Sequence, residues 1–172
     1  MNDLLQGDTA LITGAASGIG RGIALALAHE GVGVVLSDNN AVNGQRVADD
    51  LNATGAQASF LHADLSSADG AERLIRETIS RLGQLSILVH SASPKREENQ
   101  TADTVTDEQW LAMTNVNLTS GFKLGRAAAQ HMRDNKIAGR TLFITSLHAD
   151  TPRNLRHDSA WKAGTTMVMK EL

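Results

Sequence analysis

The chain has no cysteine, no tyrosine, only two prolines and an aromatic content of 3%. The absence of cysteine excludes a disulfide framework, a thiol nucleophile and a cysteine-based zinc site. No apolar run approaches the length that spans a bilayer, and residues 1–7 lack the basic and apolar segments of a secretion signal. From these absences we expect a cytoplasmic protein with no membrane partner.

The rest of the composition is typical of one globular domain. The 172 residues are 41% hydrophobic and 20% charged, which is enough for one core and too little for two ordinary domains. The net charge is -3 without a basic block, so nucleic-acid binding has no electrostatic support. The six histidines show no metal-ligand spacing. We therefore expect a single domain over residues 1–172, with no metal and no nucleic acid.

Short apolar runs alternate with helical patterns along the chain. The runs predict strands at residues 10–13, 32–36, 58–61, 86–89 and 141–144. The patterns between them predict helices over about 18–30, about 42–53, from Ser66 or Ser67 to 83, and from a capping box at 106 to about 133, with a surface loop at 93–104. This alternation predicts an α/β fold, a doubly wound parallel sheet of the Rossmann type.

A glycine-rich turn, Thr13-Gly14-Ala15-Ala16-Ser17-Gly18-Ile19-Gly20, joins the first predicted strand to the first helix. The first turn of a helix has unpaired N–H groups and the positive end of the helix dipole, which together suit a phosphate. Gly14 can make the tight turn, Gly18 lets the backbone approach a pyrophosphate, and Gly20 lets the helix pack closely on the strand. The alternative is an ordinary strand–helix turn that happens to be rich in glycine.

Asp38 follows the second predicted strand, about 20 residues beyond the glycine turn. At that place a carboxylate can accept both ribose hydroxyls of an adenosine and would repel a 2′-phosphate. Asp38 therefore favours NAD over NADP as the cofactor. The alternative role for Asp38 is that of a strand-end turn residue.

These residues resemble the short-chain dehydrogenase/reductase family. In chain order, the matching motifs are the T-G-x-x-x-G-I-G turn at 13–20, the D-L pair at 64–65, L-V-N-N-A-G at 88–93 with both asparagines and the glycine replaced, V-N-L at 116–118, the fifth strand at 139–146 and the Y-x-x-x-K region at 157–164. The resemblance implies that the cofactor is bound by Thr13, Gly14, Ser17, Gly18, Ile19, Gly20, Asp38, Asp64, Leu65, Ser91, Ala92 and Lys162. His90, at one of the replaced asparagines, is expected to be a core-edge histidine with a satisfied hydrogen bond.

The resemblance also implies hydride transfer between a nicotinamide and the carbon of a small alcohol or carbonyl compound. Asn117, Ser146 and Lys162 match the family's catalytic asparagine, serine and lysine, with Thr145 as the alternative to Ser146. The family's tyrosine position falls on Asp158, whose carboxylate is ionised at neutral pH unless deeply buried and then has no proton to give. His157 is a possible substitute donor, although a loop histidine without a role is the other interpretation.

Two functional hypotheses follow from the sequence. The first is an NAD-dependent short-chain oxidoreductase. The second is a catalytically impaired dinucleotide-binding protein or a fragment, since the tyrosine is missing and the chain ends at Leu172, within the fifth helix of the pattern. That early end predicts a sheet cut after its fifth strand, without the family's C-terminal strands and substrate loop. A domain for another nucleotide is a third class. The apolar stripe around Trp110 and Met113 fits a homo-oligomer, a dimer or tetramer, although core packing explains it equally well.

Overall fold

The computed structural model describes residues 5–94, 103–151 and 156–172, and of residues 148 and 156–158 it describes the backbone alone. The described residues form a five-stranded sheet in the order β3-β2-β1-β4-β5, with every neighbouring pair parallel. The strands are β1 (Thr9–Thr13), β2 (Gly33–Asp38), β3 (Ala58–His62), β4 (Ile87–His90) and β5 (Arg140–Phe143). The predicted doubly wound architecture is confirmed, with a strand order that is typical of the Rossmann type.

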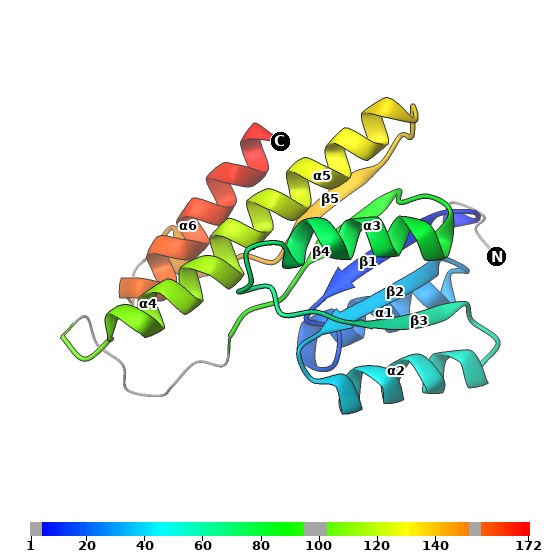
Figure 1. Cartoon of the computed structure of the whole chain (residues 1–172), viewed down its shortest axis with the longest axis horizontal. Helices are drawn as coiled ribbons and strands as arrows, with labels where there is room; N and C mark the ends of the chain where they lie inside the picture. Colours follow the sequence, from blue (N-terminus) through cyan, green and yellow to red (C-terminus); the bar gives the residue numbers. More distant parts are fainter. Residues whose placement is uncertain (1–4, 95–102, 152–155) are drawn as a thin grey trace.

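Helices cover the two faces of the sheet (Figure 1). They are α1 (Gly18–His29), α2 (Ala41–Ala53), α3 (Gly70–Leu82), α4 (Asp107–Met113), the π-helix η2 (Thr114–Thr119), α5 (Ser120–Asp134), the 3-10 helix η3 (Leu147–Ala149) and α6 (Arg156–Glu171). One face packs against α1 and α2 in a core that includes Ile12 and Val34. The other packs against α3 and α5 in a core that includes Leu11 and Leu88. The inner strands are therefore apolar on both sides, as buried parallel strands must be.

The third helix begins two or three residues later than the sequence predicts, because its N-cap is Asp69 instead of Ser66 or Ser67. The preceding residues fold into a loop: the Asp64 carboxylate accepts hydrogen bonds from the Ser66 N–H (2.9 Å) and hydroxyl (2.6 Å). Ser67 donates its hydroxyl to the Asp64 carbonyl at 2.7 Å. Such bonds between side chains and the backbone compete with a helical turn, which is why the predicted start was wrong.

The long helix predicted from residue 106 to about 133 is divided into α4, η2 and α5. The predicted capping box at the start of α4 is present. In and just after η2, the side chains of Asn117 and Ser120 donate hydrogen bonds to the carbonyl four residues earlier, at 3.1 and 2.6 Å. An α-helix uses those carbonyls for its own N–H groups, so these bonds accompany a locally widened turn. Periodicity alone does not distinguish this widened turn from a continuous α-helix.

The sheet ends at β5, where Leu142 is half-exposed. The predicted apolar stripe around Trp110 and Met113 is only partly exposed. The Trp110 side chain is half-exposed, and its ring packs on the buried Trp161 ring with the centroids 4.8 Å apart. Of the predicted loop at 93–104, residues 95–102 lie outside the described part of the chain. No helix within the described residues is long and apolar enough to cross a bilayer.

Candidate functional site

A cleft of about 510 Å³ lies at the carboxyl ends of the strands, between the loops that follow β1, β2, β3 and β4. This is the edge at which open parallel sheets bind their ligands. Five residues predicted to bind a dinucleotide line this one cleft: Gly14, Asp38, Asp64, Leu65 and Ala92. The structure thus brings together residues that are up to 78 positions apart in the sequence.

The other lining residues were not predicted from the sequence; they are Ser37, Asn39, His62, Ala63, Ser66, Ser93, Pro94, Ala112 and Val116. The sequence could have indicated some of them, because His62 and Ala63 directly follow the predicted end of the third strand, where a parallel sheet binds its ligands. Ala112 and Val116 are four residues apart, which is the spacing of one helix face. Their place at the cleft depends on the path of α4 and η2 across the sheet edge.

Each glycine of the turn is required for a different steric reason. Gly14 has φ +69°, and a Cβ there would lie 2.8 Å from the Cα of Ala92. A Cβ on Gly20 would lie 2.3 Å from the Gly14 carbonyl oxygen, whereas Gly18 has φ +54° in open space. Only glycine permits this combination of left-handed backbone and close approach. The loop after β4 and the start of α1 therefore both lie against the turn.

The start of α1 is open to solvent. Ser17, Gly18 and Ile19 are exposed, and the Ser17 side chain makes no capping hydrogen bond within the described residues. The N–H groups of the first helical turn have no acceptor inside the helix. They are available, together with the helix dipole, to an anion that reaches the turn from the cleft.

Asp38 joins two loops at the cleft. One carboxylate oxygen accepts the N–H of Ala16 at 3.0 Å, and the other accepts the N–H of Asn40 at 2.9 Å. The side chain thus has the structural role of a turn residue and lines the cleft at the same time. A carboxylate has about four acceptor positions, so each oxygen retains capacity for a further donor.

Asp64 and Leu65 form the wall of the cleft that follows β3. Leu65 is buried in the core, and Asp64 is exposed. The hydrogen bonds from Ser66 lower the pKa of Asp64 below its usual value. The carboxylate is therefore ionised at neutral pH and holds the turn of its own loop.

Thr13 is buried at the end of β1, where it bonds to the loop that follows β4. Its hydroxyl oxygen accepts the N–H groups of Ser91 and Ala92, each at 3.2 Å, and lies 3.0 Å from Nδ1 of His90. The other ring nitrogen of His90, Nε2, lies 3.2 Å from the carbonyl oxygen of Asn117. The expected buried and hydrogen-bonded histidine is thus confirmed. Through these bonds Thr13 fixes the loop that presents Ala92 to the cleft.

Asn117 lies in η2 and is buried. Its Nδ2 donates to the carbonyl of Met113, while its Oδ1 is buried without a hydrogen-bond partner among the described residues. Its carbonyl oxygen also accepts a hydrogen bond from the hydroxyl of Thr165 in α6, at 3.4 Å. A buried amide oxygen without a donor is costly, and it is typical of an acceptor that a water or ligand satisfies.

Lys162 lies on α6, and its ammonium group donates a hydrogen bond to the carbonyl of Ile144, just after β5, at 3.0 Å. Ser146 and Thr145, the two candidates for the catalytic serine, follow in the same segment and are partly buried. Helix α6 thereby contacts both η2 and the end of β5. The backbone of Asp158 lies in α6, but its side chain and that of His157 are outside the described part of the structure.

Sequence reasoning gave no role to Trp161, which precedes Lys162. Its Nε1 donates to the hydroxyl of Thr114 at 2.8 Å, and that hydroxyl donates to the carbonyl of Trp110 at 2.8 Å. The contact spans 47 positions in the sequence, and no local pattern indicates it. Among the residues that the structure describes, no group of three or more histidine, aspartate or glutamate side chains is placed to hold a metal ion.

Comparison with known proteins gives these features a context. Residues 8–172 match the family model of short chain dehydrogenases. The hydroxynaphthalene reductase-like protein Arp2 of Metarhizium brunneum (strain ARSEF 3297) is 34% identical over 147 residues, which cover 85% of this chain and 53% of that protein. Glucose 1-dehydrogenase 2 of Bacillus subtilis (strain 168) is 29% identical over 171 residues, covering 98% of this chain and 66% of that protein.

The fold has a counterpart among solved structures. A short chain dehydrogenase from Mycobacterium smegmatis superimposes with a TM-score of 0.90 and 29% identity, over 97% of this chain and 70% of that one. The chain thus spans about half the length of the Arp2 relative and about two thirds of the others. The family match extends over nearly all of the chain, and the motifs follow in family order around one cleft; this chain belongs to the short-chain dehydrogenase family.

Proposed function

We propose that the cleft binds a nicotinamide dinucleotide and that the chain forms the dinucleotide-binding domain, over residues 1–172, of an NAD(H)-dependent oxidoreductase. The observation that carries this proposal is the lining of the cleft, where Gly14, Asp38, Asp64, Leu65 and Ala92 meet from four separate loops. The residues fit such a group. The Gly14 turn leaves no room for a Cβ, and the exposed first turn of α1 offers N–H groups to a pyrophosphate.

Asp38 supports NAD as the cofactor. Its carboxylate is half-buried, is anchored by the N–H groups of Ala16 and Asn40, and keeps acceptor positions that ribose hydroxyls can fill. A 2′-phosphate at the same place would set two negative groups side by side, which partial burial makes more costly. NADP should therefore bind less tightly. Asp64 and Leu65 would flank the adenine end.

A bound nicotinamide would supply or accept the hydride. Lys162 would hold the nicotinamide ribose, and Ser146, or Thr145 in its place, would donate a hydrogen bond to the substrate oxygen. The unpaired Oδ1 of Asn117 is an acceptor suited to an ordered water in the proton path. Ser17, Gly18, Ile19 and Gly20 would bind the pyrophosphate, while Thr13 and Ser91 shape the adjoining wall.

The chain lacks the tyrosine that serves as the proton donor in this family. The family's tyrosine position holds Asp158. Loss of a positioned general acid–base group typically costs ~10²–10⁴-fold in rate. This single difference favours the second candidate function, a dinucleotide-binding protein with impaired catalysis.

The substrate class we propose is a small alcohol or carbonyl compound, as the family membership suggests. The relatives include proteins named as a reductase and as a glucose dehydrogenase, and this range does not select one compound. We also propose a homo-oligomer, dimer or tetramer, because half-exposed apolar side chains of Trp110, Leu111, Phe122 and Met167 lie on α4, α5 and α6. The cytoplasmic location remains a prediction.

The proposal is tested by calorimetric titration of the whole 172-residue chain with NADH, followed by assays with alcohols plus NAD and with ketones and aldehydes plus NADH. Saturable binding with turnover supports the oxidoreductase, and binding without turnover supports the impaired form. A correctly folded chain that does not bind NADH would overturn both.

A further inference from the structure

The loop that carries Asp64 and Leu65 has hollow space on both sides. On one side is the cleft, and on the other is a second cavity of about 280 Å³ between this loop and the helices η2 and α5. Leu65 and Ser66 line both cavities, so they form a thin wall between them. Leu65 packs into the core, but the wall has a cavity on each side, so its position also depends on a support across the second cavity.

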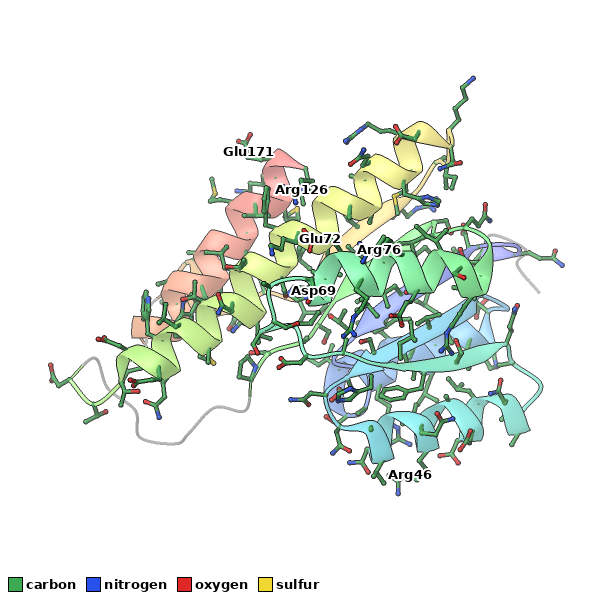
Figure 2. All side chains as sticks on the ribbon, in the orientation of Figure 1. Arg46, Asp69, Glu72, Arg76, Arg126 and Glu171 are labelled. Carbon is green, nitrogen blue, oxygen red and sulfur yellow. The ribbon has the colours of Figure 1, made fainter. Side chains whose placement is uncertain are left out.

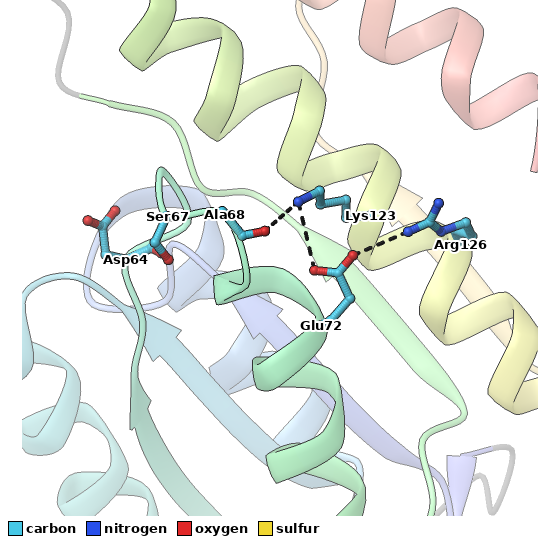
Figure 3. Close-up of polar contacts among 6 residues, drawn as sticks. All are labelled: Asp64, Ser67, Ala68, Glu72, Lys123 and Arg126. Atoms are coloured by element: carbon cyan, nitrogen blue, oxygen red, sulfur yellow. Dashed lines mark hydrogen bonds and ion pairs between the residues drawn. The ribbon is translucent and has the colours of Figure 1, made fainter.

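That support comes from one lysine. Lys123, on α5, lines the second cavity, and its ammonium group donates a hydrogen bond to the carbonyl of Ala68 at the back of the loop (Figure 3). The same ammonium lies 3.9 Å from the carboxylate of Glu72. The lysine therefore bridges from α5 to both the loop and the first turn of α3.

Glu72 lies between two cations of α5, Lys123 and Arg126. Figure 2 shows Glu72 on α3 and Arg126 on α5 at the boundary between the two helices, and their side chains pair at 3.2 Å. Arg126 thus holds the far oxygen of the carboxylate while Lys123 approaches the near one. Within the described residues, the Arg126 side chain pairs with Glu72 and lies over the Phe122 ring, and it makes no hydrogen bond or ion pair with the loop, so it serves as a control. Both pairs are partly exposed, so each of them contributes little to the stability, and the hydrogen bond from Lys123 to Ala68 is the contact that the inference uses.

Among the described residues, the other hydrogen bonds of the loop are short-range. The Asp64 carboxylate binds Ser66, and the Asp64 carbonyl accepts the hydroxyl of Ser67. These bonds shape the loop but do not fix its distance from α5. The contact of Lys123 with Ala68 does fix that distance, in addition to the burial of Leu65.

We propose that Lys123 is a positioning residue for the adenosine half of the dinucleotide site: by bridging the second cavity to the Ala68 carbonyl, it keeps the Asp64–Ser66 wall in place against the cleft. This inference rests on the proposed function, because it assigns the wall to the adenosine end of the cofactor. Lys123 lines the second cavity and does not line the cleft. Its effect is therefore confined to affinity at one end of the cleft.

The test compares the affinities of two half-cofactors, adenosine monophosphate and nicotinamide mononucleotide, in the wild type and in Lys123→Met. Lys123→Met should weaken the binding of adenosine monophosphate by roughly three- to ten-fold, the range of one lost hydrogen bond. The affinity for nicotinamide mononucleotide should stay unchanged. Amide hydrogen exchange across residues 64–69 should be faster in the variant without any ligand. Lys123→Arg, which retains a cationic donor, should restore most of both properties. Arg126→Met should stay within about two-fold of the wild type, as expected for an exposed ion pair.

The two readouts separate the possible failures. Unchanged exchange and unchanged adenosine monophosphate affinity in Lys123→Met would overturn the inference. Faster exchange with unchanged affinity would overturn the positioning role while leaving the proposed function intact. Weaker affinity with unchanged exchange would replace the support by a direct charge effect and also overturn it. A wild-type chain that binds no adenosine monophosphate would instead contradict the proposed function.

Discussion

The hydroxyl of Thr13 at the end of β1 and Nδ1 of His90 at the end of β4 lie 3.0 Å apart, both buried. Since Nε2 of His90 faces the carbonyl oxygen of Asn117, which only accepts, Nε2 carries the proton. Nδ1 must then accept the proton of the Thr13 hydroxyl, which in turn accepts two backbone N–H groups. One neutral histidine therefore connects the end of β1, the loop after β4 and the π-helix.

This arrangement predicts a stability that falls with acid. Burial lowers the pKa of His90 to about 4, below the usual value of 6.5, so the folded chain keeps this ring neutral while the unfolded chain takes up a proton. The stabilisation is complete above pH 6.5 and is lost between 6.5 and 4, a loss of about 3 kcal/mol. Urea unfolding as a function of pH measures it.

The variant His90→Asn should lose this part of the pH dependence. His29, whose side chain is 88% exposed, provides the control, because His29→Gln should keep the wild-type profile. An unchanged slope between pH 6.5 and 4 in His90→Asn would contradict the assignment.

Two glycines of α1 should respond oppositely to the same substitution. Gly20→Ala places a Cβ 2.3 Å from the Gly14 carbonyl oxygen, and Gly22→Ala places one in open space. We expect Gly20→Ala to cost about 2 kcal/mol or more and to weaken NADH binding. Gly22→Ala should gain about 0.5–1 kcal/mol, since alanine is the better helix former. Denaturant unfolding measures both, and a destabilised Gly22→Ala with an unaffected Gly20→Ala would refute the close packing of the turn.

Trp161 should stabilise the contact between α6 and η2. Trp161→Phe removes the Nε1 hydrogen bond to Thr114 but keeps an aromatic ring, so we expect a loss of about 1 kcal/mol or somewhat more. The tilted ring pair contains both tryptophans of the chain, so near-UV circular dichroism should report its disruption. Trp110→Phe, in the partly exposed partner, should be milder. Equal losses in the two variants would argue against the hydrogen bond as the cause.

Asp158→Tyr tests the missing proton donor. In a chain that binds NADH, restoring a phenol four residues before Lys162 should raise turnover by about 10²-fold or more. Adding Lys162→Met should cancel the gain, because a cation is needed to lower the pKa of the phenol. If Asp158→Tyr binds NADH normally and its rate is unchanged, the alignment of residue 158 with the tyrosine position is wrong.

The sheet could be predicted from the sequence because its strands are short apolar runs and its helices have regular periodicity. The cleft lies at the carboxyl ends of the strands, so Gly14 and Asp38 could be placed there from their spacing, whereas Asp64 was predicted from the family resemblance. The start of α3 and the π-helix were missed because side chains such as Asp64 and Asn117 bind backbone groups in ways that periodicity does not encode. The contacts of His90 with Thr13 and of Lys123 with Ala68 span 77 and 55 positions, and only the fold reveals them.

We propose that the Asp38 carboxylate makes this cleft prefer NAD(H) over NADP(H), and parallel calorimetric titrations with NADH and NADPH test this preference. The wild type should bind NADH at least roughly ten-fold more tightly, a difference of about 1.4 kcal/mol. Asp38→Asn, which keeps an acceptor for the Ala16 N–H but removes the charge, should reduce that ratio toward one. Equal or tighter binding of NADPH by the wild type would contradict this role of Asp38.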